Sequence, residues 1–185
     1  MRLNRTILNL TVAATLMAGA AIAKTNAPPL TGNDAIARDV VHKILTYPYY
    51  TLFDQVDFQL NDGTVRLVGE VTQPWKKSSL GNLIAEVQGV NTVDNELKVA
   101  PLSTFDDRIR MQVARAIYRD PALSRYGIQA IPPIHIIVDN GHVTLAGVVN
   151  TEMEKEIAGI RANSSMSFGT VTNNLRVEQP APKKN

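Results

Sequence analysis

One pattern of residues occurs twice in this chain and keeps its register through several predicted elements. The run at 61–71, NDGTVRLVGEV, aligns with the run at 139–149, DNGHVTLAGVV, so that Gly63 corresponds to Gly141, 78 positions later. The same offset aligns 93–99, VDNELKV, with 171–177, VTNNLRV. A repeat of this length indicates two copies of one structural unit.

Each copy predicts the element order α-β-β-α-β. In the first copy, apolar residues spaced three and four apart predict a helix over 36–45, and alternating apolar residues predict a strand over 56–60. Asp62-Gly63 and Asn140-Gly141 are two-residue hairpin signals, because a type I′ turn needs positive φ at both central residues. We therefore predict an α+β fold of two tandem modules, each a small three-stranded mixed sheet with two helices on one face.

The repeat also predicts the domain boundaries. Module 1 spans 33–101 and module 2 spans 104–178, with Leu102 and Ser103 as the linker. The first helices of the two copies align at an offset of 73 (Ile36 with Ile109), five less than 78, so module 2 has five extra residues before its first strand.

Three expectations concern the packing of these elements. Gly69 occupies an inward position of a strand, which predicts the close approach of a helix. In the second helix of module 2, the spacing of apolar residues predicts that Met153, Ile157 and Ile160 face the core. The acidic residues of that helix are expected to form a solvated first turn: Glu152, Glu154 and Glu156.

The first 23 residues predict a cleavable signal peptide. Arg2 and Arg5 form a positive n-region, an apolar run follows, and Ala21-Ile22-Ala23 is a cleavage signal with the cut after Ala23. We expect export to the periplasm, no transmembrane segment in the mature chain and a disordered tail at 179–185. The sequence has no cysteine, so packing alone must hold the fold in that oxidising compartment.

The charge balance argues against nucleic acid as a partner. The full sequence has 19 Lys and Arg against 17 Asp and Glu, and removing Arg2 and Arg5 leaves 17 of each sign. A neutral mature chain lacks the excess positive charge that nucleic-acid binding requires.

The repeated motifs resemble those of the BON domain family, which is named for osmotically inducible periplasmic and nodulation proteins. Module 1 carries D-G-x-V-x-L-x-G-x-V at 62–71 and G-V-x-x-V-x-N-x-L-x-V at 89–99. Module 2 keeps the first motif with Asp and Asn exchanged, and departs from the second at 165–170. The resemblance implies an envelope-maintenance role with contacts to phospholipid surfaces or envelope proteins, and it supplies no catalytic residues.

Residues for catalysis or metal binding are scattered. His42, His135 and His142 belong to three different predicted elements, and no thiolate is available as a ligand. No nucleophile elbow, phosphate loop or zinc-protease motif occurs. We expect no enzyme activity, no metal and no cofactor. An envelope hydrolase is kept as a third functional hypothesis, behind the two binding functions given below.

A basic ridge on the first helix of module 2 is one candidate binding surface. Arg108, Arg115 and Arg119 fall within about 40° of one another around a helix. Such a ridge attracts anionic lipid headgroups, at about 1 kcal/mol for each basic residue. The alternative is an ordinary solvated flank, balanced by three aspartates: Asp106, Asp107 and Asp120.

Tyrosines provide the second candidate surface. Tyr47, Tyr49 and Tyr50 follow the first helix of module 1, and Tyr126 lies in the longer loop of module 2. Amphipathic rings suit a membrane interface or a protein contact, and they also serve to cover a small core or the seam between modules.

Two functions from different classes follow. The leading hypothesis is a non-catalytic envelope-stress or envelope-integrity protein, including a response to osmotic stress, whose modules bind anionic phospholipid membrane surfaces. The alternative is a periplasmic chaperone-like or assembly-partner protein that binds outer-membrane or periplasmic proteins. The sequence leaves the oligomeric state open.

Overall fold

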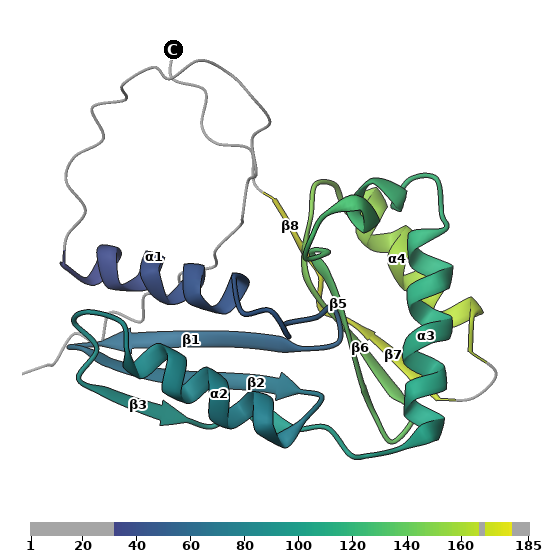
Figure 1. Ribbon diagram of the computed structural model, residues 1–185. Helices are drawn as coiled ribbons and strands as arrows, with labels where there is room; N and C mark the ends of the chain where they lie inside the picture. Colours follow the sequence, from purple (N-terminus) through teal and green to yellow (C-terminus); the bar gives the residue numbers. More distant parts are fainter. Residues whose placement is uncertain (1–31, 167–168, 179–185) are drawn as a thin grey trace, which may run out of the picture.

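The computed structural model describes residues 32–166 and 169–178, which form two modules joined by a short linker (Figure 1). The predicted signal peptide (1–23) and tail (179–185) lie outside the described residues. Across the two described stretches, no helix combines the length and the apolar character needed to cross a membrane.

The predicted element order is present in both modules. Module 1 contains α1 (Gly32–Leu45), β1 (Gln55–Asn61), β2 (Thr64–Val71), α2 (Pro74–Ala85), β3 (Thr92–Asn95) and β4 (Lys98–Val99). Module 2 contains α3 (Thr104–Tyr118), the 3-10 helix η1 (Ser124–Ile128), β5 (Ile134–Asp139), β6 (His142–Val149), α4 (Glu152–Ser164), β7 (Thr170–Asn173) and β8 (Arg176–Val177). The five extra residues of module 2 therefore lie in the connection that contains η1.

Each module has a mixed sheet covered on one face by its two helices. In module 1, β2 pairs antiparallel with β1 and parallel with β3 and β4, and module 2 repeats this order. Alternate strand residues point to the helices, so that Val65, Leu67 and Val71 are buried against Val40 and Leu80. The α+β prediction with tandem modules is confirmed.

The hairpin turns also have the predicted geometry. Asp62 and Gly63 have φ of 46° and 76°, and Asn140 and Gly141 have φ of 49° and 82°. Gly69 is required for a different reason from the predicted one. Its φ is 123°, and an added Cβ would collide with the carbonyl oxygen of Gln55 on β1, so a neighbouring strand and not a helix approaches it.

The last strand of each module is broken in two by an asparagine, which the sequence did not predict. The Asn95 side chain donates to the carbonyl of Lys77 on α2 (2.8 Å) and accepts the N–H of Leu97 (3.3 Å). Asn173 makes the same two bonds in module 2, to Lys155 and from Leu175. The asparagine of the repeated N-x-L motif therefore ties the sheet edge to the second helix.

The buried face of α4 differs from the predicted one. Ile157 packs half-buried against the core, as predicted. Met153 and Ile160 are instead 69% and 61% exposed, and the fully buried positions are the alanines Ala158 and Ala162. Glu154, expected to be solvated, is buried because it closes a capping box with Thr151 and accepts the Tyr126 hydroxyl (3.0 Å). This cap turns the Glu154 side of the helix toward the core, and the alanines allow α3 to pack closely.

The modules meet where the α1–β1 loop reaches the edge of β5. The Ile136 N–H donates to the carbonyl of Leu52 (2.8 Å), and the Tyr50 ring lies 5.6 Å from the ring of His135. His135 is only 8% exposed, and its Nδ1 is buried without a hydrogen-bond partner among the described residues. Burial lowers the pKa of His135, while the nearby Asp54 and Asp57 oppose the shift.

Acid should therefore weaken the fold through His135. Below about pH 6.5 the unfolded chain binds a proton that the buried imidazole resists, so stability falls as the pH drops toward the lowered folded-state pKa. The measurement is the free energy of unfolding between about pH 7 and pH 5 for the parent chain and His135→Gln. An unchanged pH dependence in the variant would contradict this assignment.

Candidate functional site

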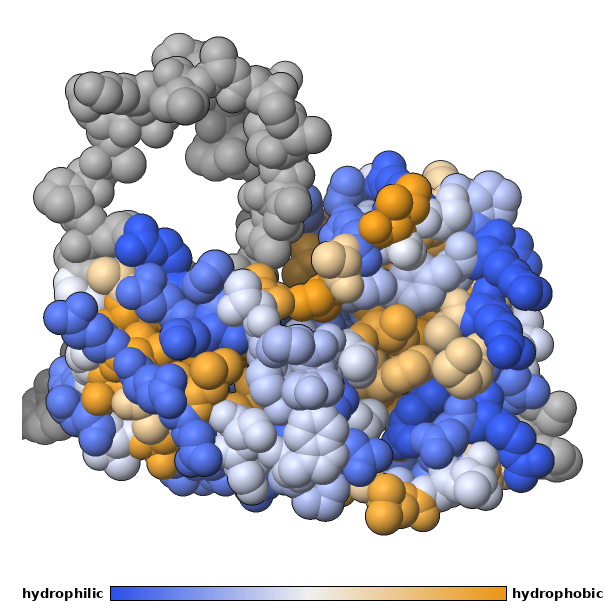
Figure 2. Space-filling model, viewed as in Figure 1, coloured by the Kyte–Doolittle hydropathy of each residue, from blue (hydrophilic) through white to orange (hydrophobic). Residues whose placement is uncertain are grey.

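Helix α3 presents a basic outer face because most of its apolar residues are turned inward, with Phe105 and Met111 as the exposed exceptions. Ser103 lies one residue before Thr104, the first residue of α3. Its side chain caps the helix by accepting the N–H of Asp106 (3.1 Å). Ile109, Val113 and Ile117 are buried in the core. The opposite face is left to long polar and flexible side chains, which Figure 2 shows as strongly hydrophilic residues along α3.

The predicted basic ridge lies on this outer face. Arg108, Arg115 and Arg119 are all exposed. Arg108 and Arg115 line a shallow surface groove of about 430 Å³ together with Met111, which is 45% exposed. The groove is completed by Asp107 and Gln112. A groove lined by an apolar thioether and two arginines gives the surface both positive charge and a side chain able to enter an apolar phase.

Of the three aspartates that would balance the ridge in the alternative interpretation, Asp106 and Asp120 are buried, and Asp107 lies in the groove. Asp106 is 1% exposed and accepts the N–H groups of Gly141 (2.8 Å) and Asn140 (3.2 Å) in the β5–β6 turn. Asp107 pairs with Arg110 (2.6 Å). Among the described residues, none forms a salt bridge with Arg108, Arg115 or Arg119.

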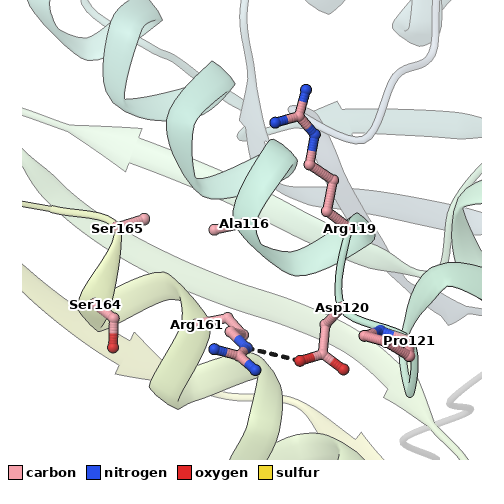
Figure 3. Close-up of a pocket in the computed structure, with 7 residues that line it drawn as sticks. All are labelled: Ala116, Arg119, Asp120, Pro121, Arg161, Ser164 and Ser165. Atoms are coloured by element: carbon pink, nitrogen blue, oxygen red, sulfur yellow. Dashed lines mark hydrogen bonds and ion pairs between the residues drawn. The ribbon is translucent and has the colours of Figure 1, made fainter.

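Asp120 is held by the end of α4. Its carboxylate accepts a bond from Arg161 Nε (2.6 Å) and the N–H of Ala122 (2.8 Å), and these bonds hold its pKa below the usual range. Figure 3 shows this pair in a second shallow groove, of about 340 Å³, with the Arg119 guanidinium pointing away from it. Arg119 therefore extends the ridge and leaves the Asp120–Arg161 pair intact.

Two of the predicted tyrosines are structural. Tyr126 is 4% exposed, and its hydroxyl accepts the N–H of Asn150 (2.9 Å) and donates to Glu154. Tyr50 is 9% exposed and packs at the module interface against His135. Both rings therefore cover a core or the seam between the modules, which was the second of the two predicted uses. Neither presents its ring to a partner on the surface.

The other two tyrosines form an exposed aromatic cluster with Trp75. Tyr49 is 58% exposed and meets the Trp75 ring edge to face, with centroids 5.0 Å apart. Tyr47, half-buried, meets Tyr49 at 5.7 Å. Trp75 is the second residue of α2 and 45% exposed. We call Tyr47, Tyr49 and Trp75 the aromatic cluster.

Groups for metal chemistry are sparse in the part of the chain that the structure describes, where no three His, Asp or Glu side chains converge on a possible metal site. The buried charges instead have structural partners. Asp54 pairs with Lys76 in module 1, and Glu154 pairs with Arg125 in module 2. The prediction of a non-catalytic protein stays a prediction on these observations alone.

Fold and surface together define a tandem-module protein with a basic helix on one module and exposed aromatic rings on the other. The BON domain profile matches the chain twice, over 33–101 and 105–179. The chain belongs to the BON domain family, as its motifs indicated. BON domains are generally non-catalytic and typical of periplasmic, membrane-associated proteins.

Comparisons with individual proteins and with solved structures give no further information about function. No curated protein matches the chain. It is similar to a structure of CdsD, a structural protein of the Type III secretion system of Chlamydia trachomatis, at 12% identity and a TM-score of 0.28, over 78% of this chain and 93% of that one. The C-terminal domain of CdsD matches at 13% identity and a TM-score of 0.27, over 76% and 96%. Scores this low carry no information about the function of this chain.

Proposed function

We propose that this protein is a non-catalytic component of the cell envelope that binds anionic phospholipid surfaces through α3 of module 2. It would act in envelope integrity under stress, including osmotic stress, after export to the periplasm. The observation that carries the proposal is the exposed charge of Arg108 and Arg115 on α3 and of Arg119 at its C-cap, none of which forms a salt bridge with a described residue.

The strength of the expected attraction follows from the charge count. Three arginines at about 1 kcal/mol each contribute about 3 kcal/mol near an anionic surface, or roughly a 100-fold change in partitioning. Exposed Met111 lies between two of them and adds an apolar contact. Because the attraction is mostly electrostatic at an exposed surface, it weakens when salt shortens the Debye length.

Module 1 lacks this ridge. At the offset of 73, the positions of Arg108, Arg115 and Arg119 are occupied by Ala35 and His42 in α1 and by Thr46 just after it. The two modules share a fold but differ at the surface that the proposal uses, so the proposal assigns membrane binding to module 2 alone.

Charge reversal on the ridge tests the proposal. The variant Arg108→Glu/Arg115→Glu/Arg119→Glu is expected to lose binding to anionic vesicles by roughly 100-fold or more in a flotation assay. A control with the same change in net charge, Arg38→Glu/Lys43→Glu/Lys98→Glu in module 1, should keep most of the binding. Equal losses in the two variants would mean that overall charge, and not α3, attracts the vesicles.

The protein-binding alternative is favoured by a separate observation. Tyr49 and Trp75 expose aromatic rings on module 1, away from the ridge in the sequence and on a different module. Tyrosine and tryptophan are enriched at the energetically dominant positions of protein interfaces. A chaperone-like or assembly-partner role would use this surface, and vesicle binding that survives the ridge variant would favour it.

A further inference from the structure

The aromatic cluster has exposed ring surface and a rigid base. Figure 2 shows residues of intermediate hydropathy gathered at the N-terminal end of α2, and Trp75 is the second residue of this helix. The rings come from two segments, the α1–β1 loop and the start of α2, and they meet edge to face. Edge-to-face packing leaves ring faces available for a ligand.

A buried ion pair fastens these two segments together. Lys76 Nζ donates to Asp54 Oδ2 (2.7 Å), and the side chains are 7% and 0% exposed. Asp54 also accepts the backbone N–H and hydroxyl of Thr51 and of Thr72. The cluster is therefore pre-organised, which reduces the entropy lost when a ligand binds.

The two segments that carry the rings expose no charged side chain of their own. Asp54 and Lys76 are the only charged residues in the segments 46–54 and 72–76, and each neutralises the other inside the protein. A ligand recognised here needs no charge, which separates this surface from the basic ridge of α3.

The polar groups around the rings favour a ligand that accepts hydrogen bonds. The hydroxyls of Thr46, Thr51 and Thr72 already donate to acceptors within module 1. By contrast, the Trp75 Nε1–H and the Tyr49 hydroxyl make no hydrogen bond with any residue in the described ranges. The groups left without a partner among the described residues thus include ring faces, the Trp75 N–H and Tyr49 O–H donors, and the amide of Gln73, which makes no capping bond.

We propose that the aromatic cluster binds a proline-rich, uncharged protein segment in the polyproline II conformation. Such a segment offers pyrrolidine rings to pack on aromatic faces and carbonyls that have no internal partner and accept hydrogen bonds. Because its conformation is already extended, binding costs little entropy.

The cluster is specific to module 1. At the aligned positions module 2 has Asp120 for Tyr47, Ala122 for Tyr49 and Met153 for Trp75. Module 2 carries the basic ridge and module 1 carries the rings, so the two copies of one fold have diverged toward different ligands. This inference goes beyond lipid binding and gives the protein-binding alternative a site and a ligand chemistry.

Trp75 is the only tryptophan in the chain, so its fluorescence reports on the site directly. The full chain is titrated with decaproline and, separately, with a glycine-serine peptide of equal length. We expect a saturable change with decaproline only. Tyr49→Ala should weaken binding about tenfold or more, because removing a central interface ring typically costs at least this much. Phe105→Ala, which removes an exposed ring from module 2, should bind like the parent.

Circular dichroism of Tyr49→Ala establishes that any loss of binding is not a loss of fold. No saturable response to decaproline would overturn the proposal. A response to chitotriose or to neutral phosphatidylcholine vesicles in place of the peptide would also overturn it, and would assign the rings to a glycan or to a membrane. The ridge variant Arg108→Glu/Arg115→Glu/Arg119→Glu should keep full peptide binding, so failure here is distinguishable from failure of the lipid proposal.

Discussion

Replacing Asp54 with alanine is expected to lower the free energy of unfolding of module 1 by about 3–5 kcal/mol, the usual cost of leaving a buried charge without its partner. Asp54 is fully buried and accepts bonds from Thr51, Thr72 and Lys76. Burial alone would raise the pKa of Asp54, but the hydrogen bonds from these three residues outweigh it and lower the pKa. The variant leaves the Lys76 ammonium buried and uncompensated.

Urea unfolding followed by Trp75 fluorescence measures this loss in module 1. The double variant Asp54→Ala/Lys76→Met should recover part of the stability, since no buried charge remains. The matched control is Glu96→Ala, which breaks the exposed pair with Arg66 (2.5 Å) in the same module and should cost less than about 1 kcal/mol. Equal costs for Asp54→Ala and Glu96→Ala would show that the buried pair is not a stabilising anchor.

Gly69→Ala is expected to destabilise module 1 by about 3 kcal/mol or more. Two effects add: φ of 123° is strained for any residue with a side chain, and the new Cβ would collide with the Gln55 carbonyl of β1. Because that carbonyl belongs to the paired strand, relief requires the hairpin to open locally.

The control for this variant is Gly32→Ala. Gly32 begins α1, and an added Cβ there meets nothing within 4 Å, so the substitution should be neutral or stabilise by up to about 1 kcal/mol. Urea unfolding followed by Trp75 fluorescence measures the stability of module 1 in both variants. Similar midpoints for Gly69→Ala and Gly32→Ala would refute the close approach of β1 to Gly69.

Much of the fold was predictable because the repeat samples the same pattern twice. The glycines at 63 and 141 predicted the hairpins, and alternation predicted which strand residues are buried. The role of Gly69 was not predictable in this way, because a glycine signals a close contact without saying which element makes it. The strand break at Asn95 depends on a bond to α2, a tertiary contact that periodicity does not contain.

The site was predictable only in part. A helical wheel placed Arg108, Arg115 and Arg119 together, but it could not show that the neighbouring aspartates bind other groups. Tyr126 was placed on a surface loop, whereas η1 turns it into the core, where it meets Glu154. The signal that was missed is the T-x-x-E sequence at 151–154, a capping box that already predicts an inward-facing Glu154.

The duplication explains how two copies of one fold can carry different binding surfaces. Core positions are kept between the copies, since Val65, Leu67 and Val71 correspond to Val143, Leu145 and Val149. The buried charge beneath the second helix is reversed instead: Lys76 corresponds to Glu154, and each is held by the loop that follows the first helix. Packing constrains the interior of both modules, while their exposed faces can specialise.

The most direct test of membrane binding is an NMR titration of the chain from Lys24 to Asn185 with anionic-lipid micelles, with neutral-lipid micelles as the control. The account predicts amide shifts concentrated in α3 and the loop through η1, between Arg108 and Ile131, and seen with anionic lipid only. Shifts of equal size with neutral lipid, shifts centred on module 1, or no response to anionic lipid would contradict the assignment of membrane binding to module 2.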